Sequence, residues 1–228
     1  KWMPIIDMAS IETVGSSLVR LYAGSPISSF YGYQVDRIDS QTGDIVYKDI
    51  NGNGIFDPED RTNIGNPNPD FTFGFTNNFS YKNWYLDVLV TGSYGGDIYN
   101  ASRFDLEMMN DFKNQSTVVL DRWTTPGQIT NVPRANSASA QYVSDRFVED
   151  GSFIKLKSAT IGYNFMSPFK GISKLNLYVT GQNLVTWTDY SGFDPEVNAF
   201  NTTNGVFGID YGTYPQVRTF IFGIKANF

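Results

Sequence analysis

The sequence contains no cysteine and no histidine among its 228 residues. Without cysteine the chain can form no disulfide and perform no thiolate chemistry. Without histidine it lacks the commonest metal ligand and the usual general base. It also contains no G-x-S-x-G nucleophile motif. These absences argue against an enzyme.

Positive charge and long apolar runs are scarce as well. The chain has 17 Lys and Arg against 23 Asp and Glu, a net charge of −6. Because no basic stripe is present to neutralise phosphates, we expect no nucleic-acid binding. No apolar run approaches the ~18 residues of a membrane-spanning helix. Spanning by helices is therefore excluded, whereas spanning by strands is not.

The first residues also lack a secretory leader. Lys1 to Asp7 show no basic segment followed by an apolar one. We therefore expect either a mature protein or a downstream part of a longer chain.

Aromatic residues are abundant, with 18 Phe, 14 Tyr and 4 Trp, and they alternate with other residues near the end of the chain. In residues 217–228 every second position is apolar, namely Phe220, Phe222, Ile224, Ala226 and Phe228. Strands place alternate side chains on opposite faces, so this segment predicts a strand with one apolar face. Such a face is typical of a barrel strand in contact with lipid. An edge or core strand of a soluble sandwich is the alternative.

Four further segments, 71–81, 84–94, 153–165 and 175–187, alternate in the same way. Lengths of about 11–13 residues suit tilted strands that cross a bilayer and exceed the ~5–6 residues of an ordinary strand. The segment 153–165 is irregular, because Lys155 and Lys157 fall on the face of Ala159. Either a bulge near Ser158 or a first half outside the lipid would explain this irregularity.

The connections alternate between short and long. Residues 81–84 and 166–174 form short links, whereas 95–151 and 188–216 are long. Transmembrane barrels alternate short periplasmic turns and long outer loops in this way, which also places residues 25–70 outside the cell. So few strands would leave open edges in lipid. We therefore predict an all-β fold, the carboxy-terminal strands of a large antiparallel transmembrane barrel with long extracellular loops.

Residues 49–60 fit a calcium-binding loop. Oxygen ligands stand at positions 1, 3, 5, 7, 9 and 12 of such loops, with glycine at position 6. Gly54 occupies position 6, and Asp60 replaces the usual bidentate glutamate. No amphipathic helix flanks the loop, so we expect structural Ca²⁺ rather than a sensor; a Gly/Asn-rich turn without metal is the alternative. The candidate ligands are Asp49, Asn51, Asn53, the Ile55 carbonyl, Asp57 and Asp60.

Three other groups permit a chemical interpretation. Asp194 and Glu196 could suggest acid/base work on a glycosidic bond. Nothing around them in the sequence predicts a raised pKa, and anchoring of a loop is favoured. The pairs Arg122-Trp123 and Pro133-Arg134 could stack on a ligand or fold the loop that contains them.

The chain resembles the SusC/RagA-type TonB-dependent transporters from about Ser25 to its end. Residues before Gly24 match poorly, and the family would place further strands near residues 11–19, where this sequence has little room. The matching stretches are SPISSFYGYQVDRI (25–38), DINGNGIFDPEDRTNIGNPNPDFTFGFTNNFSYKNW (49–84), DRWTTPG (121–127), NVPR (131–134), VEDGSFIKLKSATIGYNF (148–165), LNLYVTGQNLVTWTDYSGFDPE (175–196) and the terminal strand.

The resemblance implies a barrel of about 22 strands in the bacterial outer membrane, with a plug domain that this chain does not contain. It also implies energy from TonB, a SusD-like lipoprotein lid, and glycan or oligopeptide cargo. In similar proteins the outer loops contact lid and cargo, which directs attention to residues 95–151 and 188–216. The alternative function is a soluble, calcium-stabilised β-sandwich that binds carbohydrate.

Overall fold

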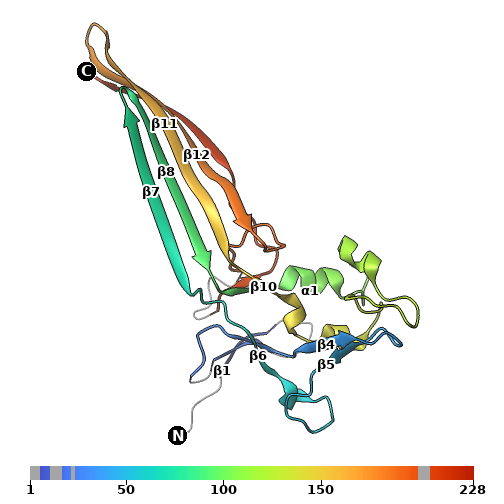
Figure 1. The fold of residues 1–228 in the computed structure, drawn as a ribbon. Helices are drawn as coiled ribbons and strands as arrows, with labels where there is room; N and C mark the ends of the chain where they lie inside the picture. The colour runs from blue at the N-terminus through green and yellow to red at the C-terminus, as the bar shows by residue number, and fades with distance from the viewer. Residues whose placement is uncertain (1–5, 11–16, 22–23, 200–205) are drawn as a thin grey trace. The chain divides into compact units, whose positions relative to one another are not determined.

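The computed structural model describes residues 6–10, 17–21, 24–199 and 206–228 (Figure 1). The chain divides into two compact units. The sheet unit comprises Pro69–Gly95, Gly151–Glu196 and Tyr214–Phe228. The second unit, called the loop unit here, comprises Lys1–Asn68, Gly96–Asp150 and Val197–Thr213.

The sheet unit is one antiparallel sheet of five strands in the order β14-β12-β11-β8-β7. In Figure 1 its long strands run side by side, and the C-terminus lies at the end where β7 turns into β8. Within the described residues the outer strands β7 and β14 each pair on one side only. The strands are β7 (Phe71–Tyr81), β8 (Trp84–Tyr94), β11 (Phe153–Phe169), β12 (Ile172–Thr188) and β14 (Thr219–Asn227).

All five predicted strands are confirmed, but one predicted link is wrong. Residues 166–174 are mostly strand, because β11 and β12 continue until only Lys170 and Gly171 separate them. Gly171 has a φ of 91°, a left-handed conformation that glycine adopts without strain. This turn therefore needs far fewer residues than the sequence indicated.

The predicted bulge near Ser158 is confirmed. The pairing of β11 with β8 skips one residue between Leu156 and Ser158, which leaves Lys157 as the extra residue. The bulge reverses the alternation, so Ile154 and Leu156 lie on the apolar face. Lys155 consequently lies on the opposite face. An unbroken alternation of side chains places it on the face of Ala159 only because such an alternation ignores the extra residue in the bulge.

The loop unit contains short strands and a small helix. A four-stranded sheet has the order β1-β2-β3-β6, a three-stranded sheet has the order β10-β9-β13, and β4 pairs with β5. The resemblance implied further strands near residues 11–19, where the sequence has little room; β2 covers the end of this range, and residues 11–16 lie outside the described residues. The elements are β1 (Ile6–Ser10), β2 (Ser17–Leu21), β3 (Phe30–Gly32), β4 (Val35–Ile38), β5 (Ile45–Tyr47), η1 (Pro58–Asp60), β6 (Thr62–Gly65), β9 (Asp97–Asn100), α1 (Ala101–Glu107), η2 (Thr117–Asp121), η3 (Ala138–Gln141), η4 (Asp145–Phe147), β10 (Val148–Asp150) and β13 (Ile209–Asp210).

The loop unit has a hydrophobic core of its own. Phe30, Tyr99 and Phe104 are almost fully buried in this core, and Ile209 joins it from the end of the chain. Parts of the long connections 95–151 and 188–216 therefore fold together instead of forming plain loops. Among the described residues, no helix is long and apolar enough to cross a membrane.

Candidate functional site

One face of the sheet is apolar and exposed. Pairing aligns its members across the sheet, for example Tyr163 with Trp84 on one side and Leu177 on the other. Phe222 and Ile224 on β14 are 78% and 75% exposed. A contiguous apolar surface of this kind marks contact with a membrane or another protein. The exposed large members are Phe71, Phe73, Phe75, Phe79, Tyr81, Trp84, Leu86, Tyr94, Ile154, Ile161, Phe165, Leu177, Val185, Trp187, Phe220, Phe222 and Ile224.

Aromatic pairs lie at both ends of this apolar face. At the end with the short turns, Trp84 and Tyr163 pack edge to face with ring centroids 4.8 Å apart. At the other end, Phe71 and Tyr94 stack at 5.4 Å. Trp84 and Tyr94 are the first and last residues of β8, so at ~3.3 Å per residue the two pairs lie roughly 33 Å apart along this strand. At the ~35–45° tilt of barrel strands this length spans ~23–27 Å of the membrane normal, which matches the ~25 Å apolar band of a membrane barrel.

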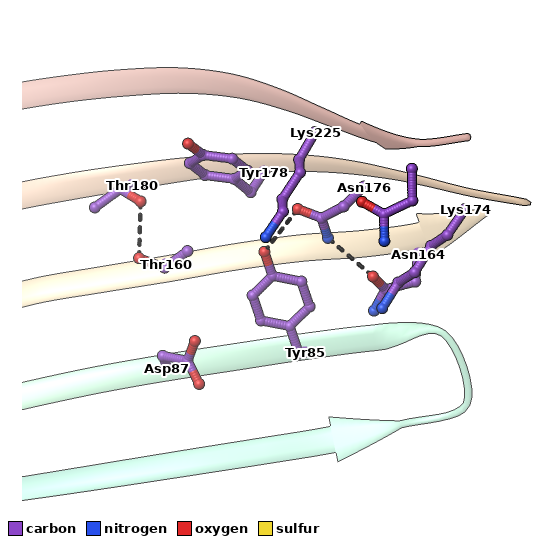
Figure 2. A pocket seen from close by; sticks show the side chains of 10 residues that line it. Tyr85, Asp87, Thr160, Asn164, Lys174, Asn176, Tyr178, Thr180 and Lys225 are labelled. Atoms are coloured by element: carbon purple, nitrogen blue, oxygen red, sulfur yellow. Dashed lines mark hydrogen bonds between the residues drawn. The ribbon is translucent and has the colours of Figure 1, made fainter. Parts of the chain in front are cut away.

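The opposite face is polar and holds a pocket of about 580 Å³ (Figure 2). Tyr85 Oη donates to Asn176 Oδ1 at 3.2 Å, and Asn176 Nδ2 donates to Asn164 Oδ1 at 3.1 Å. Beside them the hydroxyls of Thr160 and Thr180 are 2.8 Å apart. The pocket is lined by Tyr85, Asp87, Thr160, Asn164, Lys174, Asn176, Tyr178, Thr180, Lys225 and Asn227.

Two tyrosines of the polar face cover glycines on the next strand. A Cβ on Gly162 would lie 2.3 Å from the Tyr85 ring, and one on Gly223 would lie 2.1 Å from the Tyr178 ring. Bare backbone at these glycines therefore leaves room for each ring beside the sheet. Aromatic side chains that cover strand glycines in this way help to fix the register.

We expect Gly162→Ala to destabilise the sheet by about 1–3 kcal/mol, as overpacking does. The added methyl group displaces the Tyr85 ring and breaks its hydrogen bond to Asn176. Gly74→Ala on β7 is the matched control, because nothing lies within 4 Å of its Cβ position. Thermal unfolding should show a lower midpoint for Gly162→Ala only; equal midpoints for both variants would contradict this packing.

A buried lysine joins the sheet to the segment after β12. Lys155 is 1% exposed, and its Nζ lies 3.0 Å from Asp194 Oδ1 and within hydrogen-bond distance of Glu196 Oε2. Lys157 Nζ also contacts Glu196 at 3.0 Å. The backbone N–H of Gln216 donates to Asp194 Oδ2 at 3.1 Å. Lys155 thus fixes both ends of residues 194–216 to the sheet, an arrangement called the lysine clamp below.

The charges of the clamp favour loop anchoring over acid/base work of the glycosidase type. Burial alone would raise the pKa of Asp194, but the backbone N–H of Glu196 and the Lys155 ammonium outweigh it and lower this pKa. The pKa of Glu196 is also lowered, because both lysines offset its burial. A general acid requires a raised pKa. The contacts of Asp194 with Lys155 and Gln216, and of Glu196 with Lys155, confirm their interpretation as loop anchors.

In residues 49–60, called the calcium-like loop here, the side-chain oxygens accept hydrogen bonds from backbone N–H groups. Asp49 Oδ1 accepts from Gly52 N and its Oδ2 from Gly54 N, both at 2.7 Å. Asp60 Oδ1 accepts from Ile50 N at 2.9 Å, and the amide oxygens of the two asparagines accept in the same way. The pKa of Asp60 is lowered, first by the N–H of Asp57. These bonds fix the backbone of residues 49–60 in a turn.

The calcium-like loop is also anchored by an aromatic cluster. Phe56 stacks on Tyr47 with centroids 5.2 Å apart and contacts Tyr33 and Tyr142. Across the described part of the chain, no three Asp, Glu, His or Cys side chains come together in a metal-binding arrangement. A metal here would depend on the amides of Asn51 and Asn53 and on the Ile55 carbonyl in addition to carboxylates.

The remaining candidates fold the loop unit. Trp123 Nε1 donates to Ser40 O at 2.9 Å, Arg122 Nη1 to Val119 O at 3.3 Å, and Arg134 Nε to Asp44 Oδ1 at 2.9 Å. For these three side chains the structure favours the structural interpretation over ligand stacking.

The sequence analysis missed an ion-pair network in the loop unit. Glu107 is almost fully buried and binds Arg103 at 2.8 Å and Arg146 at 3.1 Å, while Arg103 also binds Glu149 at 2.8 Å. The i,i+4 spacing of Arg103 and Glu107 was the one available signal. This network joins α1 to η4 and β10.

Comparison with known proteins shows similarity over most of the chain, although no family model matches. TonB-dependent receptor P3 of Formosa agariphila is 37% identical over 91% of the chain and 23% of its own length. TonB-dependent receptor SusC of Bacteroides thetaiotaomicron is 28% identical over 90% of the chain and 20% of its own length. A solved structure of the RagAB peptide transporter superposes with a TM-score of 0.78 at 26% identity, covering 94% of the chain and 24% of its counterpart. The chain thus spans about a quarter of the length of these relatives.

Proposed function

The chain belongs to the TonB-dependent receptor family of the outer membrane, and we propose that it is part of an importer of glycans or oligopeptides. Its five long strands are a section of the wall of the family's barrel. The soluble sandwich interpretation is therefore wrong. The observation that carries the proposal is the sheet with one exposed apolar face between aromatic pairs and one polar face. The apolar face contacts lipid and the polar face lines the barrel interior.

In this proposal the whole receptor takes energy from TonB and works with a SusD-like surface lipoprotein. Residues 25–70, 95–151 and 188–216 lie on the extracellular side and contact lid and cargo. The similarity to the RagAB peptide transporter supports peptide cargo, and the similarity to SusC supports the lipoprotein partner. TonB contact and plug belong to parts of the receptor outside this chain.

Uptake by cells that lack the receptor tests the proposal. We expect the deletion strain to lose uptake of either fluorescent oligopeptides or fluorescent oligosaccharides, and a protonophore to abolish the same uptake in the parent strain. The receptor purified in detergent should carry a surface lipoprotein with it. Unchanged uptake of both pools, with no copurifying lipoprotein, would contradict the import function.

We also propose that residues 49–60 hold a structural Ca²⁺. The donors would be the side chains of Asp49, Asn51, Asn53, Asp57 and Asp60 and the carbonyl of Ile55. Carboxylate, amide and carbonyl oxygens are the ligands that Ca²⁺ prefers. Asn53 Nδ2 donates to Asp57 Oδ2 at 2.9 Å, so two of these donor side chains are already in contact, which supports the proposal.

Removal of calcium should lower the thermal midpoint of the purified receptor, and Ca²⁺ should restore it. Asp49→Ala should lower the midpoint further and abolish the response to the chelator EGTA. Glu59→Ala, which removes a neighbouring carboxylate outside the proposed ligand set, is the matched control and should keep the response. An EGTA-independent midpoint together with no calcium in elemental analysis would refute the site.

A further inference from the structure

The polar pocket of the sheet presents hydrogen-bond donors. Its internal bonds run in one direction, from the Tyr85 hydroxyl to Asn176 and from the Asn176 amide to Asn164. Both amide oxygens are thereby used as acceptors inside the pocket. The Nδ2 of Asn164 has no partner among the described residues and is left to donate. A ligand that accepts hydrogen bonds can therefore pair with this free donor.

The pocket is also locally cationic. Lys174 on β12 and Lys225 on β14 extend toward these amides (Figure 2), and neither forms an ion pair within the described residues. The carboxylate in the lining, Asp87, accepts from Asn78 Nδ2 at 2.6 Å. This contrasts with Lys155 further along the sheet, which is fully paired. Two ammonium groups close to a free amide form an anion-binding arrangement on a chain of net charge −6.

We propose that this pocket binds a peptide carboxylate, held by Lys174, Lys225 and the Nδ2 of Asn164. A volume of about 580 Å³ admits an acidic side chain with its neighbours. A carboxylate accepts several hydrogen bonds and carries the required charge. It can come from a soluble acidic peptide or from another segment of the same receptor. The proposal rests on the geometry of the sheet, so its failure would leave the import function untouched.

Peptide binding to the detergent-purified receptor tests the soluble source. Tetraglutamate is the probe and tetraglutamine its uncharged counterpart. We expect tetraglutamate alone to bind, and Lys174→Met/Lys225→Met to weaken binding about tenfold or more, as loss of charge-assisted bonds does. Lys170→Met is the matched control, because Lys170 lies in the adjacent turn and does not line the pocket; it should bind like the parent protein.

Carbodiimide cross-linking of the unmodified receptor tests the internal source, because it joins an amine to a contacting carboxylate. If another segment fills the pocket, tetraglutamate fails to bind, and mass spectrometry finds Lys174 or Lys225 joined to an Asp or Glu elsewhere in the receptor. The proposal is overturned if tetraglutamate binding is absent or insensitive to the double variant and neither lysine is joined to a carboxylate other than Asp87.

Discussion

Replacement of Lys155 by methionine should destabilise the receptor by about 3–5 kcal/mol, the usual cost of breaking a buried ion pair by removing one partner. Methionine fills a similar volume but leaves Asp194 buried without its cation. The remaining acceptor bonds of Asp194, from Glu196 N and Gln216 N, then hold a carboxylate whose charge is no longer compensated. Urea titration followed by tryptophan fluorescence should show the lower midpoint.

The same substitution should release the ends of residues 194–216 from the sheet. Limited proteolysis is expected to cut residues 189–218 faster in Lys155→Met than in the parent protein. Lys157→Met is the matched control, since Lys157 is half-exposed and such pairs contribute about 0–1 kcal/mol. Equal urea midpoints for the two variants would show that the clamp does not hold the loop.

The effect of Lys155→Met should also depend on pH. The folded-state pKa values of Asp194 and Glu196 lie below their ordinary values of 3.8 and 4.5. The stability that the two carboxylates contribute is therefore complete above these ordinary values and is lost as pH falls through the lowered ones. The difference in midpoint between Lys155→Met and the parent protein should shrink at acidic pH. A constant difference would assign the loss to packing instead of charge.

The strands of the sheet unit could be predicted because their side chains alternate. Phe220, Phe222 and Ile224 share a face whichever strand lies beside them, because the extended backbone alone places every second side chain on the same face. The bulge at Lys157 was also visible, as a break in that alternation. The partners of Lys155 were not, because Asp194 and Glu196 lie some forty residues further along the chain and only pairing brings them back.

The loop unit could not be predicted to the same extent. Its core joins Phe30, Tyr99, Phe147 and Ile209, which no local period connects. Short strands such as Ile209–Asp210 contain too few residues to show alternation. The polar pocket was hidden for a related reason, because the side chains of Tyr85, Asn164 and Asn176 meet only through the register of three strands.

Replacement of Phe222 by arginine should prevent assembly of the receptor in the membrane. Phe222 lies near the middle of β14, opposite Val179, and its side chain is 78% exposed on the apolar face. An arginine on the lipid face near the bilayer midplane costs about 2–4 kcal/mol. The receptor should therefore fail to show the folded, faster-migrating form on unheated gels, and its amount in outer-membrane fractions should fall.

The adjacent residue provides a matched control for this prediction. Ile221 lies next to Phe222 on the same strand but on the polar face, opposite Thr180. Ile221→Arg places the same charged side chain in the barrel interior, where water solvates the guanidinium, so assembly should be retained. Loss of assembly in both variants would indicate that β14 tolerates arginine on neither face. Normal assembly of Phe222→Arg would show that this face does not contact lipid, because an arginine at position 222 is tolerated only where water or protein surrounds it.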